Sequence, residues 1–480
     1  MNADPVLLAP LVLTAGTAIT AMVVIGAYRH HALTVFVTFT GLVCAVAAVP
    51  FAWSGQPGQF RMLLLLDHYA LLYQALFLLV TATVMLLSYG YLDRHERHRE
   101  EFYVLLLLAT LGAMVLVASS HFASFFLGLE LLSISLYSLI ALRQNRALGI
   151  EAALKYLVLS GTSSAFLLFG MALVYAQLGT MQLAELASAM SRAPVGDLLP
   201  GMGLISIGIG FKLALVPFHL WTPDVYQGAP APVAAFIATV SKGAVLALLI
   251  RYLGVLQLER EPAVAQLLAW AAVLSMTAGN LLALQQPNLK RLLAYSSIAQ
   301  MGYVLIAALL NPPLAALVAT FYLITYYVAI IAAFGVVTLV AVHGDELEDL
   351  GLYEGLAWRR PWLAGVLTAA MLSLAGLPLT AGFLGKFVLV TGGVGGKLWV
   401  LMIALVINSA IGLYYYLRVV SALYRKRPER TATALPAADG VAVAVAGASL
   451  AALTVLIVAL GVYPTPLLSL IGEVVARFPQ

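Results

Sequence analysis

Charged side chains are scarce in this sequence. Lys, Arg, Asp and Glu make up 10% of its 480 residues, whereas hydrophobic residues make up 62%. A soluble domain carries roughly 25% charged residues, so this chain lacks the polar surface that a water-soluble fold needs. Its composition predicts an all-α polytopic membrane protein, because a spanning helix needs about 20 consecutive apolar residues.

Cysteine is nearly absent as well. Cys44 is the only one, which excludes an internal disulfide and an iron–sulfur cluster held by four thiolates. The spacing of zinc ligands, a nucleophile elbow and a phosphate-binding loop are also missing. Gly208-Ile209-Gly210 lies within an apolar run with no strand before it, so it does not indicate nucleotide binding. We therefore expect no cofactor and no metal in this chain.

Long apolar runs fill most of the sequence, and about fourteen of them are long enough to span a membrane. The N-terminal run has neither a basic region nor a cleavage site, which predicts a first helix rather than a removed signal. We expect one integral membrane domain over residues 1–480. Its expected parts are three N-terminal helices over 1–101, a first repeat over 102–253, a second repeat over 263–424, and a C-terminal helix and tail over 440–480.

The connections between these runs differ in positive charge. If the N-terminus is outside, the inner connections hold fifteen Lys and Arg residues and the outer ones six. Cytoplasmic loops carry the excess of Lys and Arg, so both termini are expected outside. The inner set includes Arg97, Arg143, Arg146, Arg427 and Arg430.

Two apolar runs share the same irregularity. The run 198–229 contains Leu213-Ala214-Leu215-Val216-Pro217, and the run 361–392 contains Leu374-Ala375-Gly376-Leu377-Pro378. Proline breaks a helix, and the freed carbonyls need protein or water around them in a membrane. The paired breaks predict two repeats of five helices each, helices 4–8 and 9–13. Because each repeat has an odd number of spans, the second crosses the membrane in the opposite direction to the first, so the repeats are inverted. Such repeats are typical of transporters whose site lies near the breaks.

A few charged residues fall inside the predicted spans. Glu130 is the only carboxylate well inside one, and Lys212, Lys242 and Lys386 lie in predicted helices 7, 8 and 12. Burying one charged side chain at mid-membrane depth costs at least about 2.5–3.5 kcal/mol of free energy. The presence of several such side chains therefore indicates that they have a function. A buried lysine exchanges its proton readily, and we expect a proton relay in which Glu130 pairs with Lys212.

Simpler interpretations stand beside the relay. A Glu130–Lys212 pair could join helices without transporting anything. His219 could extend the relay, because histidine titrates near neutral pH, or it could be a hydrogen-bonded residue at the helix break. For Tyr326 and Tyr327, aromatic packing is the simpler interpretation, and a wet path is the alternative.

Three stretches of the sequence, Phe125–Leu131, Phe211–Tyr226 and Lys290–Tyr303, resemble the antiporter-like subunits of respiratory complex I and the related Mrp-type cation/proton antiporters. The resemblance covers about residues 1–465. Within this family, a lysine in predicted helix 12 and the stretch Pro378–Phe387 resemble one branch of the complex I subunits.

The resemblance implies one proton channel in a complex whose other subunits oxidise NADH and reduce quinone. It implies that Glu130 and Lys212 form the coupling pair, that Lys242 is the central carrier and that Lys386 belongs to the second half-channel. The resemblance implies accessory roles for His219, Lys155 and Lys290, of which the two lysines could equally be loop charges. It places NAD, FMN, iron–sulfur clusters and quinone in partner subunits.

The implied partners are other membrane subunits of the complex, namely an antiporter-like subunit M and small subunits such as K and J, together with the lipid bilayer. The implied location is a bacterial inner membrane, with both termini periplasmic. An Mrp-type Na⁺/H⁺ antiporter subunit, a related hydrogenase subunit and a scaffold with structural ions stay open. A scaffold would tolerate an apolar, volume-matched replacement of the Glu130–Lys212 pair.

Overall fold

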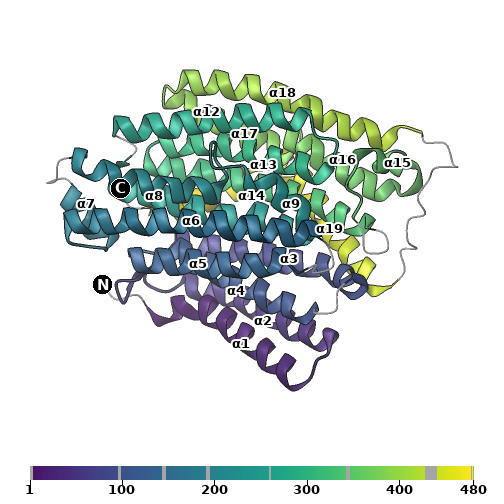
Figure 1. Cartoon of the computed structure of the whole chain (residues 1–480), viewed down its shortest axis with the longest axis horizontal. Helices are drawn as coiled ribbons and strands as arrows, with labels where there is room; N and C mark the ends of the chain where they lie inside the picture. The colour runs from purple at the N-terminus through teal and green to yellow at the C-terminus, as the bar shows by residue number, and fades with distance from the viewer. Residues whose placement is uncertain are drawn as a thin grey trace.

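The computed structural model describes residues 4–95, 99–142, 147–190, 195–258, 261–341, 346–426, 440–476 and 478. Arg97, Arg143, Arg146, Arg427 and Arg430 of the predicted inner connections lie outside these residues. Figure 1 shows α1 and α2 at one edge of the molecule and α12 and α18 at the opposite edge.

Helices form nearly all of the described structure. Their bounds are α1 Ala9–Ala27, α2 His31–Trp53, α3 His68–His95, α4 Arg99–Ala118, α5 Phe122–Ile140, α6 Ala147–Leu178, α7 Leu183–Met190, α8 Val195–Leu213, α9 Trp221–Gly228, α10 Ala231–Phe236, α11 Lys242–Leu256, α12 Pro262–Leu284, α13 Leu289–Leu305, α14 Pro312–Val340, α15 Leu356–Arg359, α16 Pro361–Ala375, α17 Ala381–Gly395, α18 Trp399–Tyr424, α19 Val441–Val462 and α20 Thr465–Val475. A hairpin of β1 Gly58–Phe60 and β2 Leu64–Leu66, which the sequence analysis does not predict, lies between α2 and α3.

The number of long apolar helices is one below the predicted fourteen. Among the described residues, thirteen helical segments have the length and apolar composition to cross a membrane. The predicted span over 361–392 is instead the pair α16 and α17, each of which is too short on its own. The prediction of a polytopic all-helical membrane protein is therefore confirmed, whereas the division of the chain into parts stays a prediction.

Both predicted helix breaks are present, and they have the same form. Helix α8 ends at Leu213 and is followed by Ala214 with φ of 58°, after which α9 begins at Trp221. Helix α16 ends at Ala375 and is followed by Gly376 with φ of 83°, before α17. A positive φ directly after the last helical residue is a common way for a helix to end.

The neighbours of these helices correspond in the two predicted repeats. Helix α6 packs on both α8 and α9, as α14 packs on both α16 and α17. Helices α4 and α5 meet closely through small residues, and so do α12 and α13. A Cβ atom on Gly112 would lie 2.5 Å from the backbone of Leu132, and one on Gly279 would lie 2.6 Å from that of Ala299. This correspondence agrees with five-helix repeats, whose inverted relation stays a prediction.

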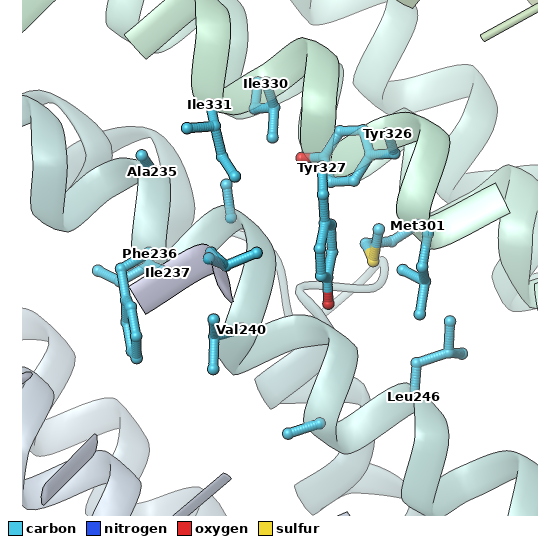
Figure 2. Packing of buried hydrophobic residues seen from close by; sticks show 14 of the residues in the cluster. Ala235, Phe236, Ile237, Val240, Leu246, Met301, Tyr326, Tyr327, Ile330 and Ile331 are labelled. Carbon is cyan, nitrogen blue, oxygen red and sulfur yellow. The ribbon is translucent and has the colours of Figure 1, made fainter. Parts of the chain in front are cut away.

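The segment α10–α11 lies in the centre of the protein. Its two helices are joined by a π-helical turn, Ile237–Ser241, and the segment is buried from Ala231 to Gly254. Membrane helices associate mainly through close packing, and Tyr327 of α14 packs on Gly243, where a Cβ atom would not fit. Figure 2 shows this apolar packing around Ala235, Phe236, Ile237, Val240, Leu246, Met301, Tyr326, Tyr327, Ile330 and Ile331.

Candidate functional site

Lys212 lies in the last turn of α8, next to the first break. Its side chain is 2% exposed, and its ammonium group donates hydrogen bonds to Ser133 at 2.5 Å and Ser160 at 2.7 Å. Because Ser133 belongs to α5 and Ser160 to α6, Lys212 joins three helices. The ring of Tyr156 lies 5.4 Å away and adds a cation–π contact.

Glu130 lies half-buried on α5, one turn before Ser133, and accepts a hydrogen bond from Ser164 of α6. Within the described ranges no direct ion pair joins Glu130 and Lys212. Lys212 is bound by Ser133, one turn after Glu130 on α5, and by Ser160, one turn before Ser164 on α6. The structure therefore places the two predicted residues on neighbouring helices and surrounds both with serines.

Lys242 is the first residue of α11, directly after the π-helical turn. It is 1% exposed and donates a hydrogen bond to Ser297 of α13 at 2.8 Å. Ser297 also accepts a hydrogen bond from Tyr326 at 2.9 Å and lies 3.2 Å from the hydroxyl of Tyr226. One hydroxyl group thus connects Lys242 with two tyrosines. π-Helical turns occur often at functional sites.

Lys386 of α17 binds the end of the half-helix that precedes its own. Its ammonium group donates to the carbonyls of Leu374 at 3.3 Å and Ala375 at 2.9 Å, and to Ser409 of α18 at 2.7 Å. The last carbonyls of a helix have no partner within the helix, and a helix C-terminus favours a cation. The second break therefore creates the site in which Lys386 is buried.

A small cavity lies beside Lys386. It has a volume of about 10 Å³, and Gln300, Tyr326 and Ser373 are among its lining residues. Since one water needs a cavity of about 10–15 Å³ by this measure, the space fits one water at most. Because Tyr326 also donates to Ser297, the cavity lies between the surroundings of Lys242 and those of Lys386.

The predicted accessory residues have different surroundings. Lys155 is half-exposed at the start of α6 and forms ion pairs with Glu151 at 2.7 Å and Asp224 at 2.8 Å. His219 is buried in the first break, and its Nδ1 atom has no hydrogen-bond partner among the described residues. Neither side chain contacts one of the three buried lysines through a hydrogen bond. Their role as accessory residues stays a prediction.

Lys290 is fully buried, although a loop charge was one prediction for it. It lies 2.5 Å from Glu346, whose side chain is also fully buried. Burial alone would raise the pKa of Glu346, but the Lys290 ammonium and hydrogen bonds from Ala231 and Tyr91 hold it below its ordinary value. Glu346 lies in an acidic stretch that is typical of an exposed loop, so the sequence does not predict its burial.

A second buried pair was missed as well. Arg251 of α11 is fully buried, and its guanidinium donates two hydrogen bonds of 2.8 Å to Asp67, which precedes α3. Arg418 of α18 is held differently, because its guanidinium donates to the carbonyls of Leu284 and Gln286 at the end of α12.

Among the described residues, no group of three His, Cys, Asp or Glu side chains could hold a metal ion. The chemistry that the site offers is hydrogen bonding and proton exchange. Lys212, Lys242 and Lys386 are each buried with hydroxyl or carbonyl partners, and no carboxylate forms an ion pair with any of them in the described part of the chain.

The comparisons with known proteins agree on one family. The sequence profile of the family described as "NADH:quinone oxidoreductase/Mrp antiporter, TM" matches residues 119–412. NADH-quinone oxidoreductase subunit N of Chromohalobacter salexigens is 46% identical over 476 residues, which cover 98% of each chain. Subunit N of Nitrosospira multiformis is 47% identical over 488 residues, covering 98% of this chain and 96% of the relative.

Solved structures show the same fold. A chain of respiratory complex I from Thermus thermophilus has a TM-score of 0.82 and 33% identity, covering 96% of this chain and 98% of that one. A chain of the Mrp complex from Dietzia has a TM-score of 0.87 at 23% identity, covering 99% and 98%. The latter likeness shows the fold alone. The chain therefore belongs to the NADH:quinone oxidoreductase/Mrp antiporter transmembrane family, and within it to the NADH-quinone oxidoreductase subunit N relatives.

Proposed function

We propose that this chain is a proton-translocating membrane subunit of an NADH-quinone oxidoreductase and moves protons through a relay of buried lysines. The observation that carries the proposal is the burial of Lys212, Lys242 and Lys386 in apolar helices without a carboxylate partner among the described residues. Burying a charge in a membrane is costly. An unpaired lysine can relieve that cost by releasing its proton, which is the step that a relay needs.

Each residue has its own part in the proposed relay. Glu130 is the charge that favours the protonated form of Lys212, because an opposite charge stabilises an ammonium group. Lys242 is the central carrier and exchanges its proton with the hydroxyl cluster of Ser297, Tyr226 and Tyr326. Lys386 carries the proton onward in the second half of the molecule, and the small cavity beside it is the place for a bridging water.

Redox chemistry belongs to the partners in this proposal. NADH, FMN, iron–sulfur clusters and quinone are bound by other subunits, and this chain supplies no cofactor site. The partners are the other membrane subunits, including an antiporter-like subunit M and small subunits such as K and J. The complex lies in a bacterial inner membrane, with both ends of this chain on the periplasmic side. The excess of Lys and Arg in alternate connections supports this orientation.

Sodium–proton exchange is the second candidate function. Its support is the fold shared with the Mrp complex chain. A sodium site usually needs several convergent oxygens, and the described residues hold no cluster of three acidic or histidine side chains. We therefore favour protons as the transported ion.

The test is Lys212→Ala in the assembled complex, reconstituted in vesicles. We expect proton pumping and coupled NADH oxidation to fall at least tenfold, about 1.4 kcal/mol in a rate barrier, while assembly is retained. Arg425→Ala is the matched control, because Arg425 is 67% exposed and pairs with Glu354 away from the buried lysines. Normal pumping by the Lys212→Ala complex would refute the relay. Uptake of labelled sodium in exchange for protons would favour the second candidate.

A further inference from the structure

Glu346 is a buried carboxylate outside the proposed relay. It lies within the connection between α14 and α15 and accepts three hydrogen bonds. Their donors are Lys290 at 2.5 Å, the backbone amide of Ala231 at 2.8 Å and the hydroxyl of Tyr91 at 2.8 Å. Ala231 is the first residue of α10. Its amide has no partner within the helix, so Glu346 caps the helix that leads to Lys242.

Lys290 holds the other side of the same junction. Besides Glu346, it donates to the backbone carbonyls of Gln227 at 2.9 Å and Ala229 at 2.6 Å. Gln227 lies in the last turn of α9, and Ala229 is the first residue after that helix. The Lys290–Glu346 pair therefore binds the chain on both sides of the connection between α9 and α10.

This connection joins the two spans that carry the first two relay lysines. Helix α9 follows the break after Lys212, and α10 leads through the π-helical turn into Lys242. Lys290 and Ser297 both belong to α13, seven residues or about two turns apart. The same helix thus fixes the start of α10 through Lys290 and binds Lys242 through Ser297.

The far end of the segment is fixed as well. Arg251 near the end of α11 forms its two hydrogen bonds to Asp67, directly before α3, and Tyr69 of α3 donates to the carbonyl of Ala247 at 3.1 Å. Tyr91, which donates to Glu346, also belongs to α3. The end of α11 is therefore held on α3, and the start of α10 is held on α3 through Glu346. Lys242 lies between these two attachments, so a shift at the start of α10 changes its position.

We propose that Glu346 and Lys290 are positioning residues that set the hydrogen bond between Lys242 and Ser297. The inference rests on the proposed function, since it assigns these residues to the proton step at Lys242. The pair acts through its geometry: Glu346 binds the first amide of α10, and Lys290 binds the last carbonyls before it. Displacing either contact shifts the start of α10 and moves Lys242 away from Ser297.

The decisive variant removes both charges at once. Replacing only one partner leaves a buried charge unpaired, which is strongly destabilising, whereas removing both is often neutral. We expect the assembled complex with Glu346→Gln and Lys290→Met to retain normal amounts on a native gel. We expect its proton pumping and coupled NADH oxidation to fall at least fivefold, because methionine cannot bind the carbonyls of Gln227 and Ala229.

Conservative variants separate positioning from mere stability. Lys290→Arg keeps the charge and the donors, so we expect at least half of the wild-type pumping rate. Glu346→Asp keeps the charge but shortens the side chain, and we expect a several-fold loss with normal assembly. This variant decides the question should the double variant not assemble. Glu354→Gln, which breaks a more exposed pair with Arg425 at 3.2 Å, is the control and should pump normally.

Lys242→Met in the same vesicles distinguishes the two proposals. If it abolishes pumping while the double variant, or Glu346→Asp, pumps at the wild-type rate, the positioning role is overturned and the relay stands. If Lys242→Met itself pumps normally, the proposed function fails. Equal losses in Lys290→Arg and in the double variant would also overturn the positioning role, because the charge and donors would then not matter.

Discussion

Lys386 and Gly376 face each other across the second helix break. A Cβ atom on Gly376 would lie 2.9 Å from Cδ and 3.2 Å from Nζ of Lys386. The same glycine has a φ of 83°, which other residues adopt only at a cost. The break and the buried ammonium group therefore depend on one residue without a side chain.

Gly376→Ala should disable the second half of the relay. The added methyl group strains the end of α16 by about 1–2 kcal/mol and displaces Lys386 from the carbonyls of Leu374 and Ala375. We expect a pumping rate at least fivefold lower in reconstituted vesicles. Gly365→Ala within α16 is the control, because a Cβ atom there meets nothing within 4 Å. Similar pumping by the two variants would contradict the role of Gly376.

Ser297→Ala should impair the central step. The serine is the only side chain to which Lys242 donates a hydrogen bond in the described part of the chain, and it also binds Tyr226 and Tyr326. Without it, Lys242 loses its connection to both tyrosines, and we expect pumping and NADH oxidation to fall together by about tenfold, or 1.4 kcal/mol. Ser449→Ala in α19, whose hydroxyl binds only its own helix at 3.0 Å, should leave both rates unchanged.

Arg251→Met should destabilise the assembled complex. It leaves Asp67 without its buried partner, and breaking such a pair costs roughly 3–5 kcal/mol. We expect a lower unfolding temperature, measured by scanning fluorimetry of the solubilised complex. Replacing Asp67 by Asn in the same chain should recover most of that loss. Arg425→Met, which breaks a pair in which Arg425 is 67% exposed, should cost at most about 1 kcal/mol.

Stability should depend on pH through Glu346. Its pKa in the folded protein lies below the ordinary value of 4.5, so its contribution is fully present above that value and is lost as the pH falls through the folded pKa. We expect the difference in unfolding temperature between the wild type and Glu346→Gln to stay constant above about pH 5 and to narrow below about pH 4. A difference that widens in acid would contradict the assignment.

The main features of the fold and the burial of Lys212, Lys242 and Lys386 could be predicted because they are local signals. A proline within an apolar run marks a break, and a lysine within such a run marks a buried charge, without any knowledge of the neighbours. Glu346 and Asp67 gave no such signal, because their partners lie 56 and 184 residues away in sequence. Their burial depends on which helices pack together, and that is a tertiary property.

The surroundings of Glu130 show the same limit. The sequence predicts that Glu130 pairs with Lys212, whereas in the described structure no direct ion pair joins the two side chains. The sequence does not predict that Ser133, Ser160 and Ser164 bind the two charges instead of a direct contact. Serines inside membrane helices often serve ordinary helix packing. Their spacing in the sequence therefore does not show whether they pack helices or bind a buried charge.

The cavity of about 10 Å³ beside Lys386 has a consequence for the membrane as an insulator. A continuous file of water through this region would let protons run back down their gradient and would dissipate the voltage that the complex builds. The described cavity has room for one water at most, so no such file passes between Tyr326 and Lys386. In the proposed relay, this packing separates a single bridging water from a leak.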